Sequence, residues 1–266
     1  MPSLEPVQLI LLAAAALVAG AVNAVAGGGS LLSFPALLAV GYPALTANVT
    51  NSVALTPGYF GGTVGYRREL GGQRARILAL GATSAAGAVV GAFLLLVSSA
   101  ALFERVVPFL IFLACGLLAV QTRLAGLVWE YREGRAGGQP AGEQAGADRH
   151  TVPLFAAQFL AAVYGAYFGA GVGIMMLAIL GIFLADTLQR LNALKGLLSL
   201  LVSVIAAVYF AIFAEVGWVA VAVMAAASLL GGQLGVVLAR RLNDQVLRWL
   251  VIAFGVAVGL RLLLAG

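Results

Sequence analysis

Two clusters of small and polar residues, each inside a long apolar stretch, are the part of this sequence best suited to chemistry. The first holds Asn23, the run Gly27 to Gly29 and Ser30, and the second holds Gly169 and Gly171. A glycine inside a helix costs about 1 kcal/mol relative to alanine, so both clusters predict a helix break. A break exposes the amides that begin the next helix, and these amides favour an anion.

A second group of polar residues follows each cluster, where the next long apolar segment begins. These residues are Asn48, Thr50, Asn51 and Ser52 after the first cluster, and Asn192 and Lys195 after the second. Lys195 is the only lysine, and its ammonium is a compact charge that suits an oxyanion. Three alternatives stay open: Lys195 snorkels to the lipid headgroups, the asparagines join helices, and the glycines only allow close helix packing.

The two clusters also form an internal repeat. Gly169 follows Gly27 by 142 residues, as Gly171 follows Gly29, and Asn192 follows Asn48 by 144. Glycine-interrupted or short hydrophobic segments at corresponding places in two halves are typical of transporters whose substrate site lies near the membrane midplane. The pattern therefore predicts a transporter of a small solute.

Composition places the chain in a membrane. Hydrophobic residues make up 62% of it and charged residues 9%, against about 25% charged residues in an average soluble domain. In lipid only helices and closed barrels satisfy all backbone polar groups, and the alternation typical of barrel strands is absent. We therefore expect an all-α polytopic membrane protein.

Charges, glycines and prolines divide the chain into ten apolar segments. They cover residues 6–26, 30–42, 46–65, 76–98, 103–122, 152–168, 172–185, 191–213, 216–239 and 246–265. The second and seventh are too short for an ordinary crossing, which takes about 20 residues, and are expected to be half-helices or arms of broken hairpins. Residues 1–128 and 151–266 form two transmembrane repeats around a flexible linker, 129–150. Five segments per half is an odd number, so the repeats are expected to be inverted.

Basic residues set the expected orientation. If the amino terminus is external, thirteen of the fifteen basic residues fall on the cytoplasmic side, and only Arg105 and Arg261 do not. The linker is then cytoplasmic and both termini are external. No acid lies near the centre of a span, so we expect electrogenic uniport rather than proton coupling, with Asp186 as the acid that tests this idea.

The stretches NAVAGGG, PALLAVG, TANVTNSVALTPG and NALK resemble the TauE/SafE family of bacterial membrane transporters, and the resemblance covers nearly the whole chain. It implies a permease of the cell inner membrane that exports sulfite or a short organosulfonate. Transport of another small oxyanion or a carboxylate is an alternative, and a membrane assembly or scaffold protein that transports nothing is another.

An enzyme is not expected. The motifs H-E-x-x-H and G-x-S-x-G are missing, and the single histidine, His150, falls in the linker. No catalytic residue, metal or cofactor is predicted. The expected partners are a small anionic substrate and membrane lipid, without nucleic acid, and homo-oligomer formation is left open. The predicted substrate site comprises Asn23, Gly27, Gly28, Gly29, Ser30, Asn48, Thr50, Asn51, Gly169, Gly171, Asn192 and Lys195.

Overall fold

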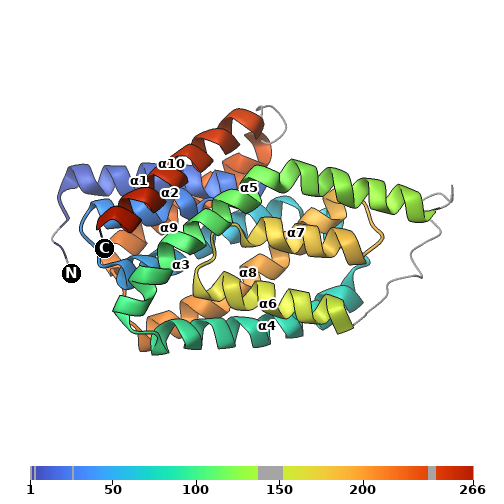
Figure 1. Ribbon diagram of the computed structural model, residues 1–266, viewed down its shortest axis with the longest axis horizontal. Coiled ribbons are helices and arrows are strands. Elements are labelled where there is room, and N and C mark those ends of the chain that lie inside the picture. The colour runs from blue at the N-terminus through green and yellow to red at the C-terminus, as the bar shows by residue number, and fades with distance from the viewer. Residues whose placement is uncertain (1, 3, 26, 137–151, 239–243, 266) are drawn as a thin grey trace.

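The computed structural model describes residues 2, 4–25, 27–136, 152–238 and 244–265 (Figure 1). Within these ranges the chain forms ten α-helices and one short 3-10 helix, and no strand. The helices are α1 (Pro6–Val25), α2 (Ser30–Ala39), α3 (Ala44–Gly65), η1 (Arg67–Leu70), α4 (Arg74–Val97), α5 (Ala100–Ala136), α6 (Val152–Tyr167), α7 (Val172–Phe183), α8 (Leu188–Phe213), α9 (Trp218–Leu238) and α10 (Asp244–Ala265). The expected all-α class is confirmed.

Five helices are long and apolar enough to cross a membrane. The candidate spans are Pro6–Ala24, Arg74–Val97, Ala100–Val120, Leu188–Phe213 and Trp218–Gly235. Helix α3 is also long, with 22 residues, but amide and hydroxyl side chains lower its mean hydropathy. This polar character is compatible with a span because α3 packs against α1, α8 and α9. Together these helices make the protein a multi-pass membrane protein.

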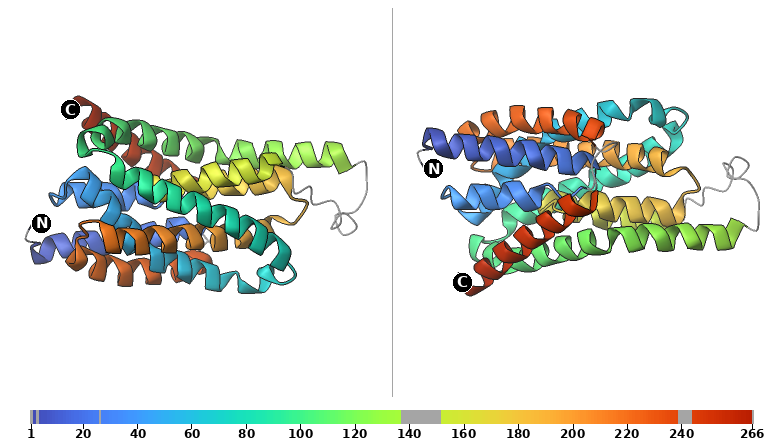
Figure 2. Two further views of the ribbon diagram at one scale, coloured as in Figure 1. Left: turned by 90° about the horizontal axis from the view of Figure 1, so that it is seen from below. Right: turned by 90° about the horizontal axis from the view of Figure 1, so that it is seen from above.

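Two hairpins of one long and one short helix give the molecule its shape. Helices α1 and α2 form the first hairpin, and α6 and α7 form the second. Figure 2 shows the first hairpin in the half of the molecule that carries both marked termini, and the second in the opposite half. Helices α2 and α7 have only 10 and 12 residues, so each bend lies inside the bundle rather than at its surface.

Helices of each half pack against helices of the other half. Helix α1 packs on α9, as α6 packs on α4, and the two central helices α3 and α8 pack on each other. Glycines allow the first two contacts to be close. A Cβ added to Gly231 of α9 would run into the carbonyl of Leu17, and one added to Gly91 of α4 would run into that of Val163. Small residues at helix contacts are the usual means of close packing in membranes.

Helix α5 is longer than the sequence indicates. The fifth apolar segment ends at residue 122 and the predicted linker begins at 129, but α5 continues to Ala136. The polar residues after 122 include arginines and glutamates, which are good helix formers, so polarity alone does not end the helix. Residues 137–151, with His150, lie outside the described part of the chain.

Candidate functional site

Helices α1 and α6 end in the same way, at the first glycine of each cluster. Gly27 and Gly169 have φ angles of +86° and +84°, in the left-handed region that glycine enters without strain. Each donates its N–H to the carbonyl five residues earlier, that of Val22 at 3.0 Å and that of Tyr164 at 3.2 Å. The glycines matched in the sequence are therefore equivalent in structure.

The helices that follow begin at matched glycines, and the two breaks touch. Gly29 is the N-cap of α2, as Gly171 is of α7. The Gly171 N–H donates to the carbonyl of Gly27 at 3.0 Å. A Cβ built on Gly27 would lie 2.8 Å from the Cα of Gly173. The two hairpins thus meet backbone to backbone, with no room for a side chain.

Gly27→Ala is expected to destabilise the protein, because the new methyl group meets Gly173 and the backbone must hold a positive φ. The expected loss is about 1–3 kcal/mol, the usual range for a strained backbone position. Thermal melting of the purified variant in detergent measures it. Gly116→Ala is the matched control, since a Cβ there has no neighbour within 4 Å. Equal melting of the two variants would contradict the close contact.

Two asparagines fix the breaks. The side-chain oxygen of Asn23 accepts from the N–H of Gly29 at 2.7 Å, and Asn48 donates through Nδ2 to the carbonyl of Tyr167 at 2.8 Å. The expectation that the break amides are exposed to a ligand is therefore wrong for Gly29 and Gly171. Their N–H groups are already bonded within the protein, because tight backbone packing leaves few groups unpaired.

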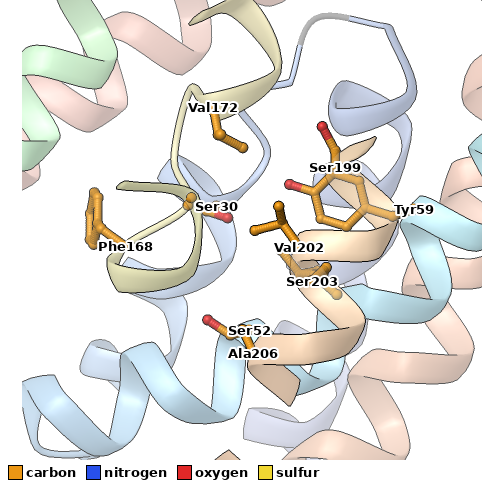
Figure 3. Close-up of a pocket in the computed structure, with 12 residues that line it drawn as sticks. Ser30, Ser52, Tyr59, Phe168, Val172, Ser199, Val202, Ser203 and Ala206 are labelled. Atoms are coloured by element: carbon orange, nitrogen blue, oxygen red, sulfur yellow. The ribbon is translucent and has the colours of Figure 1, made fainter. Parts of the chain in front are cut away.

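Two small cavities adjoin the breaks. The first, called here the lysine cavity, is partly open, has about 330 Å³ of empty space and is lined by Asn23, Ala24, Tyr59, Gly62, Thr63, Tyr66, Gly173, Asn192, Lys195, Gly196 and Ser199. The second, the serine cavity, is also partly open, has about 370 Å³ of empty space and is lined by Ser30, Ser52, Leu55, Tyr59, Gly165, Phe168, Gly169, Val172, Ser199, Val202, Ser203 and Ala206 (Figure 3). Tyr59 and Ser199 line both cavities.

Helices α3 and α8 supply most of the polar lining. On α3 the lining residues include Ser52, Tyr59 and Thr63, followed by Tyr66 at its C-cap, and on α8 they include Asn192, Lys195, Ser199 and Ser203. Residues spaced by three, four or seven positions share one face of a helix. The tyrosines and α8 serines of this set are not among the residues predicted from the sequence. Their helical spacing within otherwise apolar segments is a signal that points to them.

Lys195 is the central charged group of the lysine cavity. Its side chain is only 3% exposed, and a Cβ on Gly173 would lie 3.6 Å from its Cδ. Within the described ranges, no acid pairs with its ammonium and no hydrogen bond to it is formed. A buried unpaired charge costs several kcal/mol, which an anion in the cavity would offset. Lys195 thus lies inside the protein rather than reaching toward the headgroups.

Two amides add unpaired polar atoms beside this cavity. Asn23 is 4% exposed, and its Nδ2 lacks a hydrogen-bond partner in the described part of the protein. The oxygen of this amide is identified by its bond from Gly29, so the free group is the donor. The Oδ1 of Asn192 is also buried without a partner. Buried polar atoms of this kind commonly mark a place where water or a ligand binds.

The remaining predicted site residues have other positions. Ser30 and Gly169 line the serine cavity, whereas Gly27, Gly29 and Gly171 form the breaks and Gly28 lies buried near Leu118. The side chains of Asn48 and Thr50 form hydrogen bonds with backbone groups. Asn48 donates to the carbonyl of Tyr167, and Thr50 accepts from the N–H of Gly217 at 3.0 Å. Asn51 is 1% exposed and lines neither cavity. Three of the predicted residues, Asn23, Asn192 and Lys195, therefore come together around one cavity.

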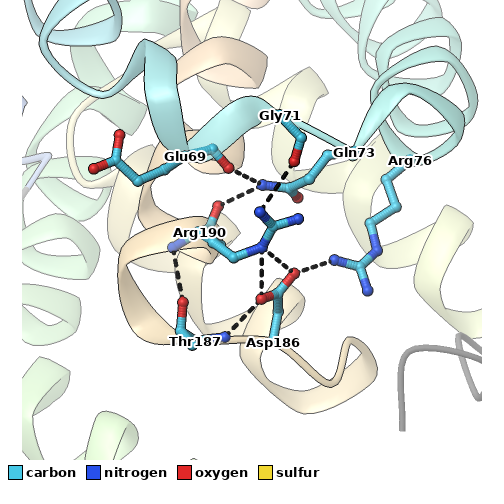
Figure 4. A network of polar contacts seen from close by, with 7 residues as sticks. All are labelled: Glu69, Gly71, Gln73, Arg76, Asp186, Thr187 and Arg190. Carbon is cyan, nitrogen blue, oxygen red and sulfur yellow. Dashed lines mark hydrogen bonds and ion pairs between the residues drawn. The ribbon is translucent and has the colours of Figure 1, made fainter. Parts of the chain in front are cut away.

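A polar network lies at the start of α8, where Arg190 precedes Asn192 of the lysine cavity by two residues; Figure 4 shows the network. Asp186 pairs with Arg76 of α4 and with Arg190, whose Nε is 2.8 Å from Oδ1. Arg190 also donates to the carbonyl of Gly71 at 3.0 Å, and Gln73 donates to the carbonyl of Arg190 at 3.1 Å. The network ties the start of α4 to the connection between α7 and α8.

The network keeps Asp186 ionised. Burial raises the pKa of its carboxyl, but hydrogen bonds outweigh burial and hold the pKa below its ordinary value of 3.8. These bonds come, in decreasing effect, from Arg190, from the N–H of Thr187 and from Arg76. An acid with a lowered pKa is a poor proton carrier near neutral pH.

Asp186→Asn is expected to lower stability by about 1–3 kcal/mol near pH 7, the usual contribution of hydrogen bonds to a charged group. Because the folded pKa is lowered, this contribution is present above the unfolded pKa and is lost as the pH falls through the folded value. Melting temperatures of the two proteins should therefore converge below about pH 4. Glu104→Gln, at an exposed acid, is the control. A difference that stays constant from pH 3 to 7 would contradict the pairing.

Comparisons with known proteins agree with this architecture. Residues 12–262 match the family described as sulfite exporter TauE/SafE. A probable membrane transporter protein of Haemophilus influenzae is 27% identical over 244 residues, which cover 92% of this chain and 90% of that protein. The probable membrane transporter protein ORF9 of a Sinorhizobium species is 34% identical over 103 residues, 39% of this chain and 40% of its own length. No solved structure matches. The match across nearly the whole chain shows that this protein belongs to the sulfite exporter TauE/SafE family.

Proposed function

We propose that this protein carries a small anion across the membrane, with sulfite or a short organosulfonate as the first candidates and export as the direction. One observation carries the proposal: Lys195 is buried, its ammonium has no countercharge in the described part of the chain, and it lines a cavity at the meeting point of two broken hairpins. The description of the family as sulfite exporters supports the choice of anion.

The transport mechanism is alternating access between inverted repeats. The exchanged packing supports this: α1 on α9 corresponds to α6 on α4, and α2 on α10 corresponds to α7 on α5. The cavities follow the same correspondence. With Asn48 matched to Asn192, Tyr59 corresponds to Ser203 and Leu55 to Ser199, so each cavity is built from equivalent parts of the two repeats. Repeats of this kind provide two related routes to one site.

The lysine cavity opens toward the cytoplasm in this proposal. Arg67, Arg68 and Arg74 are exposed at the end of the bundle that also holds Arg190 and the Asp186 network. Basic residues are enriched on the cytoplasmic side of membrane proteins. Both termini then lie outside, the linker lies inside, and the protein resides in the bacterial inner membrane.

Transport is electrogenic uniport. Asp186 stays ionised through its arginine partners, and an inside-negative potential expels an anion by about 2.3 kcal/mol per charge per 100 mV. Anion efflux from proteoliposomes should speed up when valinomycin sets an inside-negative potential. An imposed pH gradient should have no effect once protonation of the substrate is accounted for. Transport driven by the pH gradient alone, and lost in Asp186→Asn, would reject uniport.

Ligand-dependent stabilisation separates a carrier from a scaffold protein. A ligand that binds only the folded state stabilises it by about 2.7 kcal/mol at one hundred times its Kd. Sulfite, a short alkyl sulfonate, sulfate and acetate are compared as sodium salts at equal ionic strength, with sodium chloride as control. A rise in melting temperature with one or more of these anions is expected. The same melting temperature in all five salts would favour the scaffold.

A further inference from the structure

We propose that the lysine cavity binds the anion more tightly than the serine cavity, so that the transporter is half-saturated at a lower anion concentration on the lysine-cavity face. This inference rests on the proposed transport function and adds a difference between the two faces. It assigns that difference to Lys195, assisted by Asn23.

The sequence repeat identifies which residues occupy equivalent positions in the two cavities. Matching Gly27 with Gly169 pairs Asn23 with Gly165, and matching Asn48 with Asn192 pairs Lys195 with Asn51. Asn23 lines the lysine cavity where Gly165 lines the serine cavity. The serine cavity therefore lacks the amide, because Gly165 has no side chain.

The charged position differs as well. Lys195 lines the lysine cavity, whereas its counterpart Asn51 is neutral, 1% exposed and outside the lining of the serine cavity. The two cavities, which have equivalent origins, thus differ by one ammonium and by two amides, those of Asn23 and Asn192. All three groups line the lysine cavity.

Two hydroxyls of the serine cavity already form hydrogen bonds within the protein. Ser52 donates to the carbonyl of Asn48 at 2.9 Å, and Ser203 shares a hydrogen bond of 2.8 Å with Thr56. In the lysine cavity, by contrast, the Nδ2 of Asn23 lacks a partner, and Lys195 has no acceptor in the described ranges. The lysine cavity therefore has an unpaired amide donor and a charged donor, together with the unpaired Oδ1 of Asn192, whereas the donors of the serine cavity are neutral hydroxyls.

Free donors and a positive charge favour a ligand that only accepts hydrogen bonds, which is the chemistry of a sulfur oxyanion. A hydrogen bond to a charged group strengthens binding by about tenfold or more. A difference in half-saturation does not set the direction of net transport. In a uniporter the maximal rates measured from the two faces differ in the same ratio as the two half-saturation concentrations. The electrochemical gradient still decides the direction of net transport.

The test compares zero-trans uptake of labelled sulfite by inside-out and right-side-out vesicles from cells that make the protein. Labelling of a cysteine introduced by Arg68→Cys establishes the face on which the lysine cavity opens. The expected half-saturation concentration is at least about tenfold lower on that face. Lys195→Asn places the residue of the first repeat at this position. It should raise the half-saturation concentration on that face alone and so remove the difference between the two faces.

Arg105→Asn is the matched control, because it removes an equal charge from an exposed site outside both cavity linings. Size-exclusion elution and the melting temperature of each variant verify folding, and the wild-type comparison stands without any variant. Equal half-saturation on both faces, or a lower value on the serine-cavity face, would overturn the inference and leave transport intact. No sulfite uptake in either kind of vesicle, with the protein inserted, would instead count against the proposed function for sulfite.

Discussion

Lys195→Met is expected to weaken binding of the transported anion by roughly ten- to a hundredfold, because it removes the charged donor of the lysine cavity. The same substitution should raise the melting temperature of the ligand-free protein, since it replaces a buried unpaired charge with an apolar side chain of similar length. Opposite effects on binding and on intrinsic stability distinguish a binding residue from a structural one.

Thermal melting of Lys195→Met at increasing anion concentration measures both effects in one experiment. Arg105→Met is the control, because Arg105 is exposed and lines neither cavity. An unchanged affinity, in a variant that is inserted and folded normally, would show that Lys195 does not contact the anion. A lower melting temperature without ligand would show that its charge is already compensated.

Tyr59→Ala is expected to abolish the transient accumulation seen in counterflow. The Tyr59 side chain lies beside Ser199 and opposite Ser30 (Figure 3), and both Tyr59 and Ser199 line the two cavities. Removing the ring would join the cavities into one continuous path. An anion on such a path runs down its own gradient and is not carried by exchange.

Counterflow of labelled sulfite in proteoliposomes measures this change. Tyr59→Phe keeps the ring and should retain counterflow, and Phe60→Ala removes a neighbouring aromatic side chain that is 56% exposed. Normal counterflow in Tyr59→Ala would place the barrier elsewhere. Loss of counterflow in Tyr59→Phe would assign the effect to the hydroxyl group instead of the ring.

Much of the fold follows from local features of the sequence. The eighth segment, 191–213, corresponds to α8, Leu188–Phe213, because an apolar run bounded by charges defines a helix in a membrane. The glycine pairs located the two breaks, since only glycine enters a positive φ without strain at Gly27 and Gly169. Helix α5 continues beyond its apolar run, because lipid thickness limits the hydrophobic part of a helix and not a polar extension outside the membrane.

The site was harder to predict, because it depends on which face of a helix turns inward. Tyr59 and Ser199 are single polar residues within apolar segments, and the packing of α3 on α8 decides that both line the cavities. The amide of Gly29 also looked free in the sequence. Its bond to the side chain of Asn23 arises only when the first hairpin closes. Pairings of this kind depend on backbone geometry that sequence patterns do not contain.

The most direct test of the account is counterflow in proteoliposomes that contain the purified protein. Vesicles loaded with unlabelled sulfite, or with a short sulfonate, are diluted into a trace of the same labelled anion. We expect transient accumulation of label in vesicles with the wild-type protein, little in those with Lys195→Met, and none in empty vesicles. No accumulation with sulfite, sulfonates, sulfate or carboxylates, together with accumulation of a labelled cation, would contradict anion transport.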